Sequence, residues 1–165
     1  MVIKNAKFVI SVADAKSLYN TETSEIAIAG KSNVGKSSFI NYICNNGKLA
    51  RTSGDPGRTR LLNYFEVNNG EFFFVDLPGY GYAKVSQAEK ERWGKLMEDY
   101  FAAGRIDLGV FIVDARHAPT NNDITMANWF IESGLMENAI TRSNPLNIPQ
   151  VNELFLWSQR YEKPF

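Results

Sequence analysis

The chain has few of the features that mark secreted, membrane or disulfide-stabilised proteins. Its 165 residues include a single cysteine, Cys44, so no disulfide can form within the chain. No apolar run reaches the roughly 18 residues of a membrane-spanning helix, and no long apolar segment follows the lysines of Met1 to Phe8, as a secretory signal would require. These absences predict a cytoplasmic protein with no membrane partner.

Net charge is also lacking, because 18 Lys and Arg residues balance 18 Asp and Glu residues. No overall field for a polyanion is therefore expected. Basic residues gather locally at Lys48, Arg51, Arg58 and Arg60, opposed only by Asp55. This group is either a solvated loop or a local contact for phosphates or RNA. The length favours one domain over residues 1–165.

The most informative feature that is present is the octet G-K-S-N-V-G-K-S, which matches the phosphate-binding pattern G-x-x-x-x-G-K-[ST]. A short apolar run, Glu25 to Ala29, precedes it and predicts a buried strand, while Ser38 to Cys44 predicts an amphipathic helix. Strand, glycine loop and helix together form a phosphate site, because loop N–H groups and the helix N-terminus face the anion. The predicted phosphate-binding residues are Gly30, Lys31, Ser32, Asn33, Val34, Gly35, Lys36 and Ser37.

Alternating strand and helix patterns predict an α/β fold of the P-loop NTPase type. We expect a three-layer sandwich with a mostly parallel sheet, one antiparallel strand pair, and helices on both faces. The antiparallel pair is a hairpin of residues 61–67 and 71–76, joined by Asn68-Asn69-Gly70. Ser86 and Glu89 predict a capped helix, residues 108–113 predict a strand, and Asn122 is expected to cap a helix that ends near residue 133. Cys44 is expected to be a buried apolar residue.

Two further elements accompany the phosphate loop. Asp76-Leu77-Pro78-Gly79 is a D-x-x-G element at a strand end, where Asp76 suits Mg²⁺ and the Gly79 N–H can meet a γ-phosphate. Thr59 lies in a loop between the two elements, and its hydroxyl can complete Mg²⁺ coordination when a triphosphate is bound. Lys36 would contact the β- and γ-phosphates and Ser37 would bind Mg²⁺. The predicted metal ligands are therefore Ser37, Thr59 and Asp76. The order of these elements resembles that of a translation-factor-type GTPase rather than that of a kinase-type P-loop enzyme.

Several longer strings resemble the EngB (YihA/YsxC) family of bacterial GTPases. They are G-K-S-N-V-G-K-S-S, A-R-T-S-x-x-P-G-R-T, N-Y-F-E-V, V-D-L-P-G-Y-G-Y-A-K-V and V-D-A-R-H. The resemblance implies a monomer that binds GTP or GDP with Mg²⁺ and acts in assembly of the large ribosomal subunit and in septation. Further nucleotide contacts are expected at Gly57, Arg58, Thr59, Arg60, Leu61, Asp76, Leu77, Pro78, Gly79, Trp157 and Ser158.

Hydrolysis is expected to be slow. Tyr80 stands where Ras-like enzymes place a water-orienting Gln, and no other base is evident, since a structural role is favoured for His117. The expected catalytic set is Lys36, Thr59 and Gly79, with a rate of about 10⁻⁴ to 10⁻² s⁻¹. Asn33 either shapes the loop or, as in some related GTPases, helps to bind K⁺ beside the phosphates.

The guanine-reading motif [NT]-K-x-D is lacking, because the last Asp in the chain is Asp123. We expect an internal deletion between Leu135 and Met136 and a C-terminal truncation, with Trp157 standing where the family places the first Ser of its base-contacting S-S-x element. Losing two hydrogen bonds to a carboxylate would weaken guanine discrimination by roughly 3–6 kcal/mol. Three functions stay open: a GTPase switch, a degenerate phosphate- or RNA-binding module, and an ATP-using P-loop enzyme.

Overall fold

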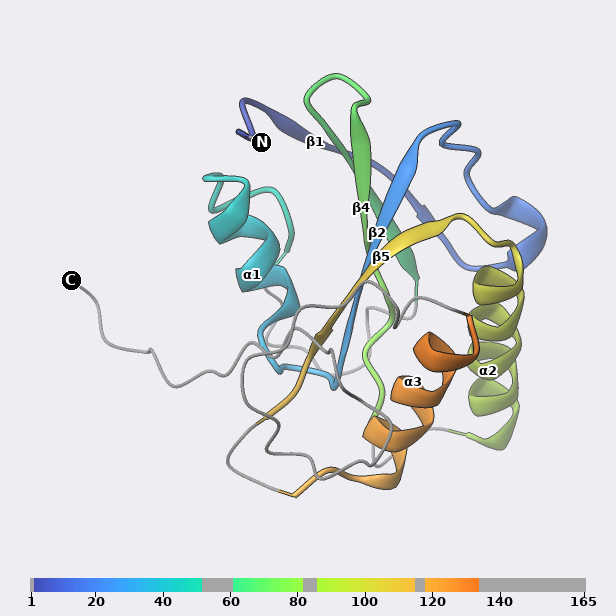
Figure 1. Cartoon of the computed structure of the whole chain (residues 1–165). Coiled ribbons are helices and arrows are strands. Elements are labelled where there is room, and N and C mark those ends of the chain that lie inside the picture. The colour runs from blue at the N-terminus through green and yellow to red at the C-terminus, as the bar shows by residue number, and fades with distance from the viewer. Residues whose placement is uncertain (1, 52–60, 82–85, 115–117, 134–165) are drawn as a thin grey trace.

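The structure, a computed structural model, describes residues 2–51, 61–81, 86–114 and 118–133. These residues form a five-stranded sheet of order β1-β3-β4-β2-β5, with three α-helices and one short 3-10 helix (Figure 1). The strands are β1 (Ala6–Val12), β2 (Ser24–Gly30), β3 (Leu62–Val67), β4 (Phe72–Asp76) and β5 (Ile106–Ile112). The helices are η1 (Ala15–Ser17), α1 (Lys36–Ile43), α2 (Gln87–Ala102) and α3 (Asn121–Glu132).

The sheet combines parallel and antiparallel pairing. β2 lies parallel to both β4 and β5, and β3 and β4 form the predicted antiparallel hairpin. β1 adds a second antiparallel pairing, with β3, that the sequence did not predict. The α/β class of the fold is confirmed, while the predicted deletion between Leu135 and Met136 lies outside the described residues.

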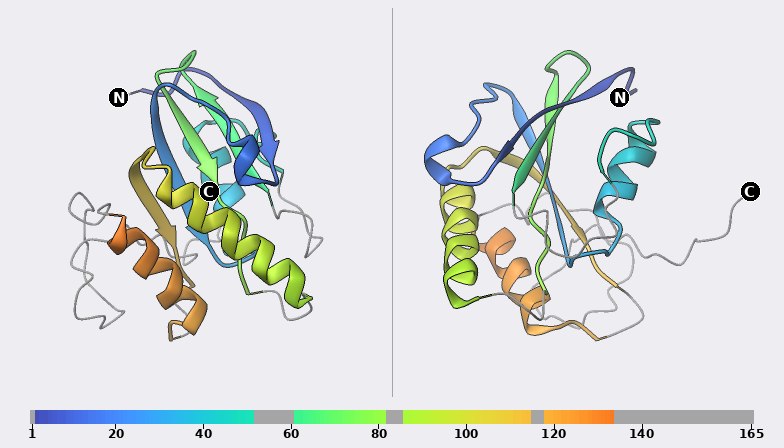
Figure 2. Two further views of the ribbon diagram at one scale, coloured as in Figure 1. Left: turned by 90° about the vertical axis from the view of Figure 1, so that its right-hand side faces the viewer. Right: turned by 180° about the vertical axis from the view of Figure 1, so that it is seen from behind.

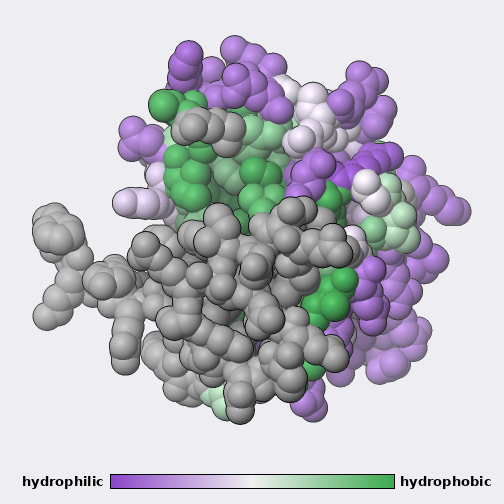
Figure 3. All heavy atoms as spheres, viewed as in Figure 1, coloured by the Kyte–Doolittle hydropathy of each residue, from purple (hydrophilic) through white to green (hydrophobic). Residues whose placement is uncertain are grey.

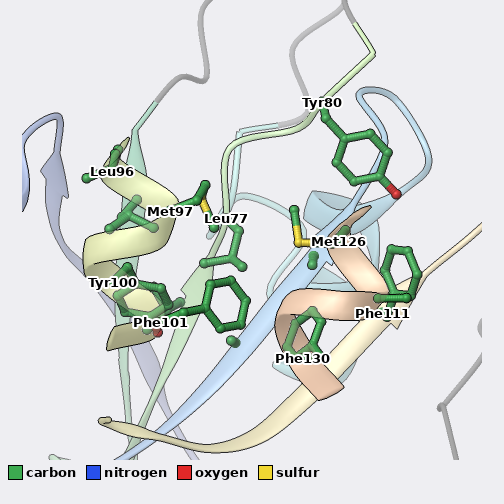
Figure 4. Close-up of a cluster of buried hydrophobic side chains, with 14 of the residues drawn as sticks. Leu77, Tyr80, Leu96, Met97, Tyr100, Phe101, Phe111, Met126 and Phe130 are labelled. Atoms are coloured by element: carbon green, nitrogen blue, oxygen red, sulfur yellow. The ribbon is translucent and has the colours of Figure 1, made fainter. Parts of the chain in front are cut away.

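Helices cover both faces of the sheet, as predicted. α1 lies on one face and α2 and α3 lie on the other (Figures 1 and 2). The side of α1 has a core that includes Ile40, Phe74 and Ile112. The opposite core includes Met97 and Phe130, and Figure 4 shows part of it.

The outer surface carries both hydrophilic and hydrophobic side chains on the face that Figure 3 shows. Figure 3 shows mostly hydrophilic side chains over α2 and a hydrophobic area near α1. Among the described residues, no helix is both long enough and apolar enough to cross a membrane.

Local signals explain most element boundaries. Asn68, Asn69 and Gly70 have φ values of 49°, 59° and 95°, which are the positive angles that this hairpin turn requires. The capping box of Ser86 and Glu89 is confirmed at the start of α2. Cys44 is buried, as expected, and burial raises the pKa of its thiol to about 11.

The start of α3 differs from the prediction. Its N-cap is Thr120 rather than Asn122, and Thr120 forms a reciprocal capping box with Asp123. The side chain of Thr120 accepts a hydrogen bond from the Asp123 N–H, while the Asp123 carboxylate accepts from the Thr120 N–H. Two backbone donors are satisfied together in this arrangement, which a cap at Asn122 would not achieve.

Candidate functional site

The phosphate loop and the D-x-x-G turn lie at the same edge of the sheet. Both follow the carboxyl ends of parallel strands, because Ile28 of β2 pairs with Asp76 of β4. The Leu77 N–H continues this register by donating to the Ile28 carbonyl at 2.9 Å. Ligands in open α/β sheets bind at this edge, so the two predicted elements are placed where they can act on one ligand.

The loop itself has a backbone that suits an anion. Asn33 and Gly35 have φ values of 62° and 108°, and a 3.2 Å hydrogen bond from the Val34 N–H to the Lys31 carbonyl closes a turn. Gly35 is the N-cap of α1 and provides no capping side chain. The N-cap residue therefore does not compete with a ligand for the first N–H groups of this helix. The left-handed backbone of Asn33 fits the loop-shaping role, while K⁺ binding stays a prediction.

Lys36 is buried within the loop. Its Nζ donates to the Gly30 carbonyl at 3.1 Å and lies 3.5 Å from the Lys31 carbonyl. Burial lowers the pKa of Lys36, and the nearby charge of Asp76 opposes this shift. The ammonium group is thus held over the loop by backbone carbonyls, and an anion at the loop would supply the charge partner that such burial demands.

Gly79 packs directly on the phosphate loop. A Cβ atom at this position would lie 2.9 Å from the Ser32 Cα and 3.0 Å from the Lys36 Nζ. The structure therefore brings together Lys36 and Gly79, two of the three residues predicted to be catalytic. Only glycine allows the D-x-x-G backbone to approach the loop this closely.

Asp76 and Ser37 carry oxygen atoms of the kind that could hold a magnesium ion. Asp76 is 3% exposed, and its Oδ1 has no hydrogen-bond partner among the described residues. Burial raises the pKa of Asp76 to about 6, and the charge of Lys36 opposes this shift. Ser37 lies half-buried in the first turn of α1. Hydroxyl and carboxylate oxygens are the ligands that Mg²⁺ accepts, alongside phosphate oxygens and water.

The magnesium site would depend on the nucleotide as well as on the protein. Across the described part of the chain, no group of three or more His, Cys, Asp or Glu side chains comes together. An ion at Ser37 and Asp76 would thus need phosphate oxygens to complete its coordination.

The remaining predicted site residues divide into two groups. Leu61 lies at the same sheet edge, since it precedes β3 and Asn63 of β3 pairs with Asp76. Pro78 is buried in the D-x-x-G turn itself. The others lie outside the described residues, so their roles stay predictions: Gly57, Arg58, Thr59, Arg60, Trp157 and Ser158. His117 also lies outside the described residues.

One contact of the site was not predicted. The Tyr80 hydroxyl donates to the Asp123 Oδ1 of α3 at 2.5 Å. The backbone carbonyl of Tyr80 accepts from the Ser32 N–H at 2.9 Å. The T-x-x-D spacing of Thr120 and Asp123 was the available signal for the cap, but nothing local joins Asp123 to a residue 43 positions earlier.

Comparisons with known proteins agree with this geometry. The family described as 50S ribosome-binding GTPase matches residues 25–142. The probable GTP-binding protein EngB of Clostridium kluyveri is 53% identical over 131 residues, which are 78% of this chain and 66% of that protein. The protein of the same name from Mycoplasma capricolum is 52% identical over 126 residues, or 76% of this chain and 64% of that protein. The chain thus spans about two thirds of the length of these curated relatives.

Two solved structures are also similar. A crystal structure of a probable GTP-binding protein EngB aligns with a TM-score of 0.54 and 27% identity, covering 68% of this chain and 65% of that chain. The Era protein of Aquifex aeolicus, a point variant bound to GDP and AlF₄⁻, aligns with a TM-score of 0.53 and 20% identity. That alignment covers 82% of this chain and 51% of the Era chain, and it supports the fold alone.

Proposed function

The chain belongs to the EngB family of GTP-binding proteins, and from that premise we propose that it is a Mg²⁺-dependent switch that binds GTP and hydrolyses it slowly to GDP and phosphate. The observation that carries this proposal is the close approach of Gly79 to Ser32 and Lys36. A triphosphate at the loop would meet the Lys36 ammonium and the Gly79 backbone at the same point, which makes the D-x-x-G turn sensitive to the γ-phosphate.

The phosphate half of the site is supported by the described residues. The loop amides and the N-terminus of α1 would bind the phosphates, and the Lys36 Nζ would neutralise charge on the β- and γ-oxygens. Ser37 and Asp76 would hold Mg²⁺, and Thr59 would join them when the triphosphate is bound. The ion supplies charge neutralisation for phosphoryl transfer.

The base half of the site carries the second candidate function. No [NT]-K-x-D motif occurs in the 165 residues, so recognition of guanine would be weaker than in a GTPase that has this carboxylate. A phosphate- or RNA-binding module without guanine specificity is therefore the alternative. The two functions differ in whether hydrolysis depends on guanine.

The cellular role is proposed from the family. The description of the matching family as a 50S ribosome-binding GTPase supports a role in assembly of the large ribosomal subunit, with ribosomal RNA as partner. We further propose a monomeric, cytoplasmic protein that is needed for septation, because this is what the family resemblance implies. K⁺ beside Asn33 would accelerate hydrolysis, and equal GTPase rates in KCl and NaCl would exclude it.

Binding of a fluorescent GDP to the full 165-residue chain, with and without Mg²⁺, tests the function. Lys36→Ala should weaken binding by roughly 10- to 150-fold, because hydrogen bonds to a charged group contribute about 1.5–3 kcal/mol. The matched control is Lys90→Ala on the exposed surface of α2, which should leave binding unchanged. Competition by GTP and ATP measures the preference for the base, and equal competition would favour the alternative function. Equal binding by Lys36→Ala and the unaltered chain would refute phosphate binding at this loop.

A further inference from the structure

Tyr80 is held at both ends of the residue. It is 4% exposed, and it belongs to the same buried cluster as Phe111 of β5 and Met126 of α3. Figure 4 shows its ring at the margin of this cluster, with the hydroxyl pointing away from the ribbon that carries it. Its carbonyl accepts from the Ser32 N–H and its hydroxyl donates to Asp123. A residue that directly follows Gly79 therefore connects the phosphate loop to α3.

The acceptor of the Tyr80 hydroxyl is itself fixed. One oxygen of the Asp123 carboxylate accepts from Tyr80, while the other accepts from the Thr120 N–H at 2.7 Å and from the Thr120 hydroxyl at 2.6 Å. Burial and the carboxylate both raise the pKa of Tyr80, so the phenol stays protonated and acts as a donor. A charged acceptor strengthens this hydrogen bond.

The two contacts of Tyr80 restrain the backbone directly after Gly79. Gly79 is the preceding residue, and its backbone is close enough to the loop that a Cβ would meet Ser32 and Lys36. Because the ring is buried and has little room to rotate, a shift of Tyr80 away from α3 would also displace the carbonyl that accepts from Ser32. The D-x-x-G turn would then lose its position beside the Lys36 ammonium, which is the group expected to contact the γ-phosphate.

We propose that the Tyr80–Asp123 hydrogen bond is a latch that holds Gly79 at the phosphate loop, so that α3 sets the affinity for a nucleoside triphosphate relative to a diphosphate. Tyr80 is thus a positioning residue rather than a catalytic residue. The inference rests on the proposed function, because it concerns the same loop and the same nucleotide. The Gly79 N–H is expected to meet the γ-phosphate, which a diphosphate lacks, so opening the latch should affect diphosphate binding little.

Tyr80→Phe provides the direct test, because it removes the hydroxyl and keeps the buried ring. Displacement of a fluorescent GDP by GDP and by a non-hydrolysable GTP analogue gives both affinities. Tyr80→Phe should lower the affinity for the triphosphate by on the order of tenfold and change that for GDP less than twofold. Asp123→Asn should have the same effect, since it weakens the acceptor.

Thr120→Ala is the matched control. It removes the capping hydroxyl from the same carboxylate but leaves the bond from Tyr80, so the ratio of the two affinities should stay as in the unaltered chain. An equal loss for both nucleotides in Tyr80→Phe, an unchanged ratio, or a tighter triphosphate complex would each overturn the latch. A ratio that Thr120→Ala shifts as strongly as Tyr80→Phe would attribute the effect to the helix cap instead.

Hydrogen exchange of the Ser32 amide separates the latch from the proposed function. This amide donates to the Tyr80 carbonyl, and it should exchange about tenfold faster in Tyr80→Phe than in the unaltered chain. Absence of nucleotide binding by the unaltered chain would refute the proposed function, and the exchange rate would still test the latch. Unchanged exchange of Ser32 in Tyr80→Phe would overturn it.

Discussion

Replacing Gly79 with alanine should separate the D-x-x-G turn from the phosphate loop. The new Cβ would lie 2.9 Å from the Ser32 Cα and 3.0 Å from the Ser32 N, whereas ordinary contacts begin at 3.4 Å. Because both neighbours are backbone atoms, relief requires the two segments to move apart by about half an ångström. Overpacking of this kind costs about 1–3 kcal/mol.

The third neighbour of the new Cβ determines how this cost affects function. The Lys36 Nζ would lie 3.0 Å from it, so the ammonium group must also move from its place over the loop. If the whole overpacking energy destabilises the arrangement in which Gly79 and Lys36 lie together at the loop, the affinity for a triphosphate decreases about 5- to 150-fold.

Fluorescent-nucleotide displacement measures this loss, with thermal unfolding measured in parallel. Gly47→Ala is the control, because a Cβ at Gly47 has no neighbour within 4 Å and should change neither quantity. Triphosphate affinity within twofold of the unaltered chain, together with unchanged thermal stability, would show that Gly79 does not approach the loop as described.

Two further predictions concern stability. Gly109→Ala places a Cβ against the Phe130 ring, closer than real Cβ atoms approach a neighbour, and should destabilise the fold by about 1–3 kcal/mol. Gly94→Ala, in open space within α2, should instead stabilise the fold by about 0.5–1 kcal/mol. Urea unfolding compares the two variants, and equal effects on the free energy of unfolding would contradict the packing. Burial raises the pKa of Glu25 above 4.5, although the hydrogen bond from Tyr100 acts in the opposite direction. The contribution of Glu25 to stability should therefore decrease as the pH rises from 4.5 through its pKa in the folded protein. Glu25→Gln should remove this dependence, and its stability relative to the unaltered chain should be more favourable at pH 7.5 than at pH 4.5; a constant difference would refute the assignment.

Local sequence signals predicted the elements whose geometry is set by neighbouring residues. The hairpin follows from three adjacent residues, Asn68 to Gly70, that all adopt positive φ. The cap of α2 follows from Ser86 and Glu89 in the same way. The phosphate loop was predictable because its glycines and Lys36 are adjacent in the sequence and together form one backbone loop. The position of Asp76 followed from the rule that the carboxyl ends of parallel strands lie at a common edge of the sheet.

Contacts between distant residues could not be predicted in this way. The buried carboxylate of Glu25 accepts from Tyr100, which is 75 residues away in the chain, and no local pattern indicates that partner. The pairing of β1 with β3 is also non-local, and buried and exposed residues do not alternate along β1. Tyr80 is the instructive case, because its position after D-x-x-G suggested only a missing glutamine, while its role in the fold depends on Asp123 of α3.

Two buried charges, Lys36 and Asp76, fit the proposed binding of a nucleotide with Mg²⁺. Burial lowers the pKa of Lys36 and raises that of Asp76, so each charged form is less favourable there than in water even though the two charges attract each other. The Asp76 Oδ1 also has no hydrogen-bond partner in the described part of the chain. Replacing a buried charge pair with apolar side chains is often neutral or stabilising, so the pair is weak evidence for a role in stabilising the ligand-free fold. A phosphate beside Lys36 and a divalent cation beside Asp76 would compensate both charges at once, which is why the same two residues are unfavourable for the empty fold and suited to a nucleotide with Mg²⁺.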